Sequence, residues 1–220
     1  MVGVGVTSYK RPEYLRRWRQ EVFKYSKENE FRLCEAVDDD TQRLGIARNK
    51  NYCLDVLSNC EYIFLFDDDC FPQKEGWVDY FISEHERTGQ HHFMYLKDTA
   101  NIVKIRDEKG IGVYNNCAGC FLFLTQEVLK KVGYFNKEYG VYGFEHAGYS
   151  ERIHRAGLTP FGKYLAPAQT PNYIYSMDYD FGKHDIESHK PSISFKEAKE
   201  SVQKNRDVYI KEINTIYQPL

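Results

Sequence analysis

Apolar runs alternate in the first hundred residues with segments whose apolar residues recur every three or four positions. The runs lie at residues 2–7, 31–37 and 62–66. Such uninterrupted runs predict strands buried on both faces of a parallel sheet. Helical spacing follows each run, at residues 12–23, 44–57 and 77–86. This β-α-β-α-β-α order predicts a parallel sheet with helical crossovers.

The second half of the chain departs from this order. Short candidate strands lie at residues 93–96, 102–105, 111–114 and 120–125, and a candidate helix at 126–132. A loop rich in Gly and Tyr at 139–144 then leads into a helix of roughly ten residues, which we expect to end at Gly157. The charged segment from Phe195 to Tyr217 predicts a mostly polar helix. No linker or repeat divides the chain, so we predict a single α/β domain.

Composition excludes several protein classes. The chain has 220 residues, 42% of them hydrophobic and 28% charged, and a formal net charge of -2, so nothing in the balance requires a nucleic acid or an anionic membrane. No run approaches the ~20 apolar residues of a membrane span. The six cysteines lack the density of a secreted disulfide scaffold. These features predict a cytoplasmic protein without a membrane span.

Acidic clusters follow two of the predicted strands. Asp67, Asp68 and Asp69 come directly after the third strand, and Asp38 and Asp39 after the second. Ligands of open α/β sheets bind beyond the carboxyl ends of the strands, where both clusters fall. Three adjacent carboxylates repel one another, and a divalent cation such as Mg²⁺ or Mn²⁺ would relieve that repulsion. The alternative is a solvated acidic turn.

Six segments in order resemble glycosyltransferase family 2, which has the GT-A fold. They are residues 6–12, 36–40, 45–49, 67–69, 118–135 and 143–157. The resemblance runs from about Val2 to about Gly157 and implies a single GT-A (Rossmann-like) domain, with helices flanking a mostly parallel sheet. It divides the chain into a nucleotide-sugar-binding part at 1–97, an acceptor-binding part at 98–190 and a helical tail at 191–220. The implied enzyme is an inverting, metal-dependent glycosyltransferase.

The resemblance also implies roles for individual residues. Asp69 would be the main ligand of Mn²⁺ or Mg²⁺, with Asp67 contacting both metal and donor. Two histidines of the C-terminal region, His184 and His189, are further candidate metal ligands. The expected donor is a nucleotide-sugar, most simply a UDP-sugar. Its remaining contacts would come from Thr7, Tyr9, Arg11, Asp38, Asp39, Arg48 and Asp68.

The general base is where this sequence departs from the family. The family has a Glu-Asp pair, whereas here Glu145 is followed by His146. Either Glu145 takes the proton of the acceptor hydroxyl while His146 orients the acceptor, or His146 takes it, since imidazole titrates near neutrality. We favour Glu145.

Two other functions compete with sugar transfer. A nucleotidyltransferase also places aspartates at the ends of parallel strands, but it would need a Gly-rich loop after the first strand, and residues 7–12 lack one. A non-catalytic nucleotide-sugar-binding protein is the other alternative. The acceptor is left open by the sequence: a saccharide, a glycan polymer, another hydroxyl-bearing molecule or a modified DNA base would each fit.

Overall fold

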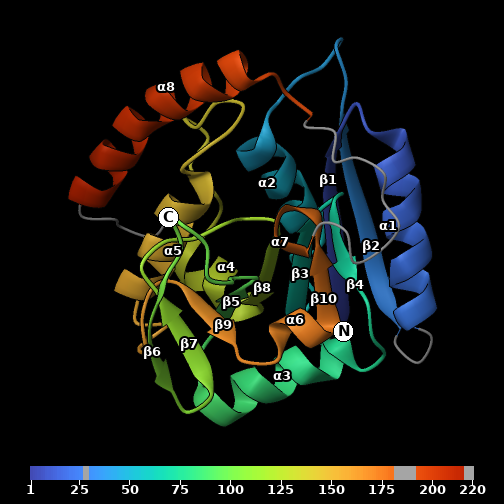
Figure 1. Cartoon of the computed structure of the whole chain (residues 1–220), viewed down its shortest axis with the longest axis vertical. Helices are drawn as coiled ribbons and strands as arrows, with labels where there is room; N and C mark the ends of the chain where they lie inside the picture. Colours follow the sequence, from blue (N-terminus) through green and yellow to red (C-terminus); the bar gives the residue numbers. More distant parts are fainter. Residues whose placement is uncertain (27–29, 181–191, 216–220) are drawn as a thin grey trace.

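The computed structural model describes residues 1–26, 30–180 and 192–215, and its largest sheet has five strands (Figure 1). Their order across the sheet is β2-β1-β3-β8-β5. The bounds are β1 (Val2–Tyr9), β2 (Phe31–Asp38), β3 (Tyr62–Asp67), β5 (His92–Met94) and β8 (Phe121–Thr125). β1 is parallel to β2 and β3, whereas β8 is antiparallel to both β3 and β5. The predicted α/β class with a mostly parallel central sheet is confirmed.

Helices cover both faces of this sheet, and each face has its own core. The helices are α1 (Pro12–Tyr25), α2 (Ile46–Val56), α3 (Trp77–Thr88), α4 (Gln126–Val132) and α5 (Glu145–Arg155). On β3, Phe64 and Phe66 belong to an aromatic core shared with α1 and α3, while Ile63 and Leu65 belong to a second core shared with α2, α4 and α5. Side chains alternate between the faces of a strand, so one strand serves both cores.

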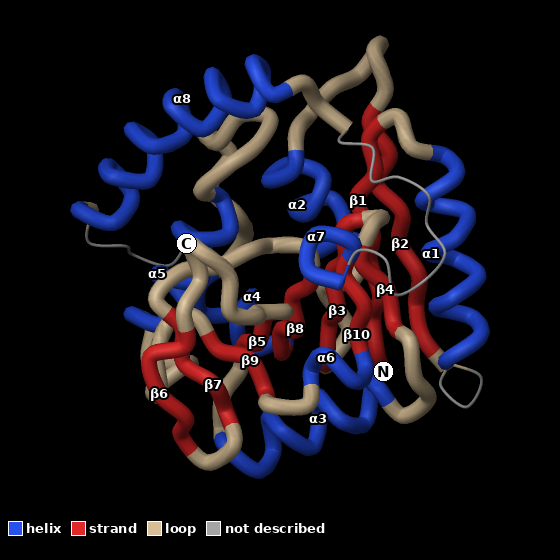
Figure 2. Tube along the Cα trace, viewed as in Figure 1, coloured by secondary structure: helices blue, strands red, loops and turns tan. Residues whose placement is uncertain are grey.

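Two small sheets and two short helices complete the described part of the fold (Figure 2). They contain β4 (Cys70–Pro72), β6 (Lys104–Glu108), β7 (Ile111–Tyr114), β9 (Leu165–Pro167) and β10 (Ile174–Ser176), with helices α6 (Thr170–Tyr173) and α7 (Met177–Asp180). β4 pairs with β10, immediately after the acidic cluster. The strand expected at 102–105 is found at 104–108, because its residues are mostly exposed and therefore carry no clear apolar pattern.

The predicted polar helix is present as α8 (Phe195–Asn214), but it is not a free tail. It packs against α5 and lies over the loop that leads into α5 (Figure 1). Ser194 caps its first turn by accepting a hydrogen bond from the Glu197 N–H at 3.2 Å. Among the helices of the described ranges, none is long and apolar enough to cross a bilayer.

Candidate active site

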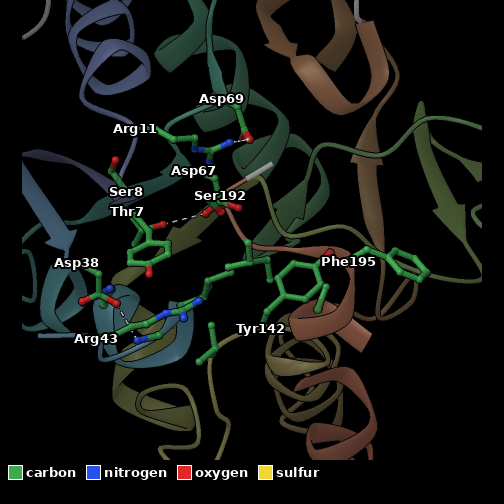
Figure 3. Close-up of a pocket in the computed structure, with 17 residues that line it drawn as sticks. Thr7, Ser8, Arg11, Asp38, Arg43, Asp67, Asp69, Tyr142, Ser192 and Phe195 are labelled. Carbon is green, nitrogen blue, oxygen red and sulfur yellow. Dashed lines mark hydrogen bonds and ion pairs between the residues drawn. The ribbon is translucent and has the colours of Figure 1, made fainter. Parts of the chain in front are cut away.

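A cavity of about 350 Å³ opens at the carboxyl ends of β1, β2 and β3 (Figure 3). Three strand ends line it, those of β1, β2 and β3, together with the beginning of α2 and the loop before it. A further wall is made by the loop before α5 and the start of α8. The lining residues from the strand ends and α2 are Thr7, Ser8, Tyr9, Arg11, Asp38, Arg43, Gly45, Ile46, Asn49, Asp67 and Asp69. Sequence positions far apart therefore converge on the edge where the acidic clusters were expected.

The first and third carboxylates of the cluster face this cavity, and the middle one does not. Asp67 Oδ1 lies 2.8 Å from Lys50 Nζ and accepts a hydrogen bond from Thr7 Oγ1 at 2.9 Å. Asp69 Oδ2 lies 2.8 Å from Arg11 Nη1. Figure 3 shows the Thr7–Asp67 and Arg11–Asp69 contacts as dashed lines. Both carboxylates are thus held in place while lining the cavity.

Asp68 is buried behind its two neighbours. Its carboxylate accepts a hydrogen bond from Ser8 Oγ at 2.6 Å and pairs with the second guanidinium nitrogen of Arg11. Arg11 therefore bridges Asp68 and Asp69, and with Lys50 it offsets the repulsion among the three carboxylates. Asp68 does not line the cavity, so its contact with a donor would be indirect.

The same surroundings give the first two carboxylates opposite pKa shifts. Burial, the largest effect on Asp67, opposes its ionisation, but Lys50, His146 and Thr7 together outweigh burial and lower the pKa of Asp67. At Asp68 burial dominates, and repulsion from the other two carboxylates adds to it. The pKa of Asp68 rises to about 7 despite Arg11 and Ser8. Asp67 is therefore kept as a carboxylate at neutral pH, as a ligand of a cation must be.

The described residues offer two carboxylates to a divalent cation, and donor phosphates could supply further oxygen ligands. The described residues contain no cluster of three or more His, Cys, Asp or Glu side chains arranged to hold a metal. Mg²⁺ in nucleotide sites is commonly held by one or two carboxylates together with substrate phosphates. Asp67 and Asp69, both facing one cavity, are such a pair. His184 and His189 lie outside the described residues.

Three of the expected donor contacts, Asp38, Asp39 and Tyr9, lie in different surroundings. Asp38 lines the cavity, and its Oδ2 accepts the backbone N–H groups of Leu44 and Gly45 at 3.0 and 2.8 Å. Asp39 is exposed, lies outside the cavity lining and accepts local hydrogen bonds from residues 41 and 42. The centroid of the Tyr9 ring lies 4.3 Å from the Arg43 guanidinium carbon, so Arg43 covers one face of this ring, which was an expected donor contact.

Arg48 points away from this cavity. It lines a second hollow on the other side of the 140–141 loop, together with Lys137 and Lys204. Its Nη2 donates to the Lys137 carbonyl at 3.4 Å. Contact between Arg48 and a nucleotide in the first cavity would require a rearrangement of this side chain.

Glu145 and His146 begin α5 and are both buried. His146 Nδ1 lies 3.0 Å from Glu145 Oε1. The other two polar atoms, Glu145 Oε2 and His146 Nε2, are buried without a hydrogen-bond partner among the described residues. Leaving a buried polar atom without a hydrogen bond costs free energy of folding. In native proteins such an atom calls for an explanation, and a catalytic role is one of them.

A single buried lysine connects this pair to the acidic cluster. Lys50 Nζ contacts Asp67 and also donates to the Gly119 carbonyl at 2.8 Å. The His146 ring lies against Gly119 so closely that a Cβ there would come within 1.9 Å of Nδ1. Glu145 and His146 do not line the 350 Å³ cavity, but a chain of contacts through Gly119 and Lys50 connects His146 to Asp67 in the cavity wall.

Several of these residues could not be chosen from the sequence. Lys50 follows Asn49 in a helix where a lysine is ordinarily solvated, and Arg43 lies in a polar loop. In the sequence, Gly119 is recognisable only as a small residue before an apolar strand. Nothing in the sequence of α8 indicates a contribution to the site, because its charged composition is typical of a solvated helix.

The mostly parallel central sheet, its flanking helices and the C-terminal helix form a mixed α/β fold, and the structural neighbours of the chain are GT-A glycosyltransferases. No family model matches the chain. It is 31% identical over 128 residues to an uncharacterised glycosyltransferase of Acanthamoeba polyphaga mimivirus, a match that covers 53% of this chain and 48% of that protein. The chain therefore spans about half the length of the curated relative it matches.

Solved structures support the same fold. S. aureus TarS in complex with UDP-GlcNAc superimposes with a TM-score of 0.59 at 11% identity, covering 99% of this chain and 68% of that one. GalNAc-T7 with UDP, GalNAc and Mn²⁺ also gives 0.59, at 13% identity over 97% and 50% of the two chains. A Drosophila β1,4-galactosyltransferase 7 variant with manganese, UDP-Gal and xylobiose gives 0.51, at 17% identity over 90% and 79%. At such low sequence identity, structural similarity establishes the fold and nothing beyond it.

Proposed function

We propose that this protein is an inverting, metal-dependent glycosyltransferase that moves a sugar from a UDP-sugar to the hydroxyl group of a saccharide. One observation carries the proposal. Asp67 and Asp69 line the same cavity as the end of β1 and the start of α2, at the edge of the sheet where α/β folds bind ligands. The UDP-sugars, Mn²⁺ and xylobiose bound in the structural neighbours are consistent with it.

The residues of the cavity divide the binding of the donor among them. Asp67 and Asp69 would hold Mn²⁺ or Mg²⁺ together with the diphosphate oxygens of the donor. Such a cation neutralises the charge that grows on the diphosphate as the sugar departs. Tyr9 and Asp38 also line the cavity and would bind the nucleoside, while Arg11 keeps Asp69 in position.

Inversion at the anomeric carbon needs a base for the acceptor hydroxyl. We assign this role to Glu145, with His146 holding its Oε1 in place. The support for this choice is that Glu145 Oε2 is buried and has no partner in the described part of the chain. An acceptor hydroxyl that reached this oxygen would give up its proton there while its own oxygen attacks the sugar.

The proposal is tested by incubating the protein with Mn²⁺ and a panel of UDP- and GDP-sugars. Glycosyl transfer or release of UDP is the expected result, lost with a chelator and restored by Mn²⁺. Pyrophosphate release from a nucleoside triphosphate would instead indicate a nucleotidyltransferase. Binding of a nucleotide-sugar without any turnover would indicate a binding protein.

Two substitutions test the assigned residues. Glu145→Gln should lower turnover by roughly a hundredfold or more while leaving donor binding intact, since a general base contributes about that much. Asp69→Asn should weaken the dependence of the rate on Mn²⁺ concentration. The matched controls are Glu138→Gln and Asp79→Asn, which change exposed carboxylates outside the cavity lining. Near-wild-type turnover of Glu145→Gln would reject Glu145 as the base.

A further inference from the structure

Helix α8 has a single fully buried side chain, and it is polar. Asn205 lies on the face of α8 that meets the loop before α5. Its Oδ1 accepts the Gly140 N–H at 2.8 Å, and its Nδ2 donates to the carbonyl oxygens of Tyr142 at 3.0 Å and Gly143 at 2.9 Å. One amide side chain thus binds three backbone groups of the loop, at residues 140, 142 and 143.

The loop that Asn205 binds ends in a strained turn. Gly143 has φ 101° and Phe144 has φ 69°, and Phe144 directly precedes Glu145. A bulky residue in the left-handed region is rare and persists only when surrounding contacts hold it there. The direction in which Glu145 enters α5 depends on these two backbone conformations.

Contacts from α8 hold this turn on its other sides as well. Val202 packs so closely on Gly143 that a Cβ there would lie 2.8 Å from its Cγ2. The Phe144 ring stacks on Tyr209, with centroids 5.2 Å apart. Further along, Glu212 Oε1 lies 2.8 Å from Arg152 Nε, which fixes α8 to α5.

The same loop forms a wall of the donor cavity. Val141 and Tyr142 line the cavity, as does Ala198 of α8 itself (Figure 3 labels Tyr142 and Phe195 on this wall). The Val141 carbonyl accepts the N–H of Ile46 at 3.3 Å, so the loop also meets the beginning of α2. Ser201 Oγ accepts the Tyr142 N–H at 2.9 Å and donates to the Tyr142 carbonyl at 2.8 Å.

We propose that Asn205 is a positioning residue through which α8 sets both the donor-cavity wall and the placement of Glu145. The inference rests on the proposed glycosyl transfer, because that reaction gives a function to each end of the loop: one end binds the donor and the other positions the general base. Ser201 fixes only the Tyr142 end, which forms the wall. Asn205 fixes that end and the Gly143–Phe144 turn together.

The two residues therefore give different kinetic signatures. Asn205→Asp keeps the shape of the side chain but replaces the two N–H donors by an oxygen that repels the Tyr142 and Gly143 carbonyls. We expect its kcat to fall at least tenfold and its KM for the donor to rise severalfold. Ser201→Ala should raise the donor KM severalfold with kcat within twofold of wild type. Gln203→Glu, an amide-to-acid change on the exposed face of the same helix, should change neither.

Hydrogen exchange provides a readout that needs no turnover. The amides of Gly140 to Gly148 should exchange at least tenfold faster in Asn205→Asp than in Gln203→Glu, while the central strands keep their protection. If Asn205→Asp is too unstable to purify, Ser201→Ala carries the test through its predicted separation of KM from kcat. Unchanged exchange at Gly140–Gly148 in Asn205→Asp, or wild-type kinetics despite faster exchange, would overturn the proposal.

Failure of the proposed function can be told apart from failure of this inference. If the wild-type protein transfers or hydrolyses no nucleotide-sugar, the proposed function fails. UDP binding, measured by calorimetry, then replaces the kinetics. UDP affinity weakened by Asn205→Asp and Ser201→Ala but not by Gln203→Glu would still support the role of α8 in the cavity wall, and equal affinities would reject it.

Discussion

Lys50 is a fully buried cation whose ammonium group contacts both Asp67 and the Gly119 carbonyl. Burying a charge is costly unless it is paired and hydrogen-bonded, and here both conditions hold. The position also has a functional meaning. Lys50 keeps Asp67 ionised from the inner side, which leaves the cavity side of that carboxylate to a ligand.

Replacing Lys50 alone should therefore lower the free energy of unfolding more than replacing Lys50 and Asp67 together. Lys50→Met leaves Asp67 without its counter-ion and should lower the free energy of unfolding by about 3 kcal/mol, as for other broken buried pairs. The double variant Lys50→Met/Asp67→Asn should recover part of that loss. Urea denaturation of the wild type, both single variants and the double variant measures the coupling. Strictly additive losses would show that the pair contributes no coupling energy.

The connection between β2 and α2 is closed by one side chain. Asp38 ends β2 and accepts two backbone N–H groups from residues 44 and 45, just before α2 begins. Gly45 takes φ 84°, and a Cβ there would lie 2.7 Å from the Gly140 carbonyl oxygen. This connection thus places the first turn of α2 against the 140–141 loop, on the cavity wall.

Asp38→Ala should lower stability and weaken donor binding together. The loss of two charge-assisted hydrogen bonds leaves two N–H groups without a partner and should lower the free energy of unfolding by about 2 kcal/mol. The donor KM should rise at the same time because the start of α2 lines the cavity. Thermal unfolding and donor titration measure the two effects, with Asp79→Ala as the exposed control. A raised KM with unchanged stability would mean that Asp38 acts on the donor directly rather than by closing the connection.

At the scale of the whole molecule, β8 is the antiparallel strand between β3 and β5, and His92 of β5 connects this part of the sheet to α5. His92 of β5 is fully buried, with Nδ1 3.0 Å from the Phe123 carbonyl of β8 and Nε2 2.9 Å from Ser150 Oγ of α5. Burial, the largest effect, lowers the pKa of His92 to about 4. The folded protein therefore keeps this imidazole neutral well below its ordinary pKa.

Stability should consequently fall as the pH drops from about 6.5 to about 4. In that range the unfolded chain has its histidine protonated and the folded chain does not, so the unfolded state binds more protons and gains from acid. At pH 5 this one group should cost about 2 kcal/mol relative to pH 7. Urea denaturation at both pH values should show a smaller loss for His92→Asn than for the wild type. Equal losses would place the acid sensitivity elsewhere.

The sequence by itself determined the parts of this protein whose signal is local. The strands that carry the acidic clusters, the helices α1 to α5 and the α/β class followed from apolar periodicity, which reports burial directly. The edge at which Asp67, Asp69 and Asp38 meet followed from parallel strand order. The short strand β4 was missed because a pairing of three residues leaves little periodicity to detect.

Only the tertiary structure decided how these residues are used. It turned Asp67 and Asp69 toward the cavity and Asp68 away from it, because Arg11 and Ser8 hold the middle carboxylate. It directed Arg48 to a different hollow and brought α8 onto the loop before Glu145. These arrangements join residues 60 to 160 positions apart through side-chain contacts that no local pattern encodes, so they exist only once the chain has packed.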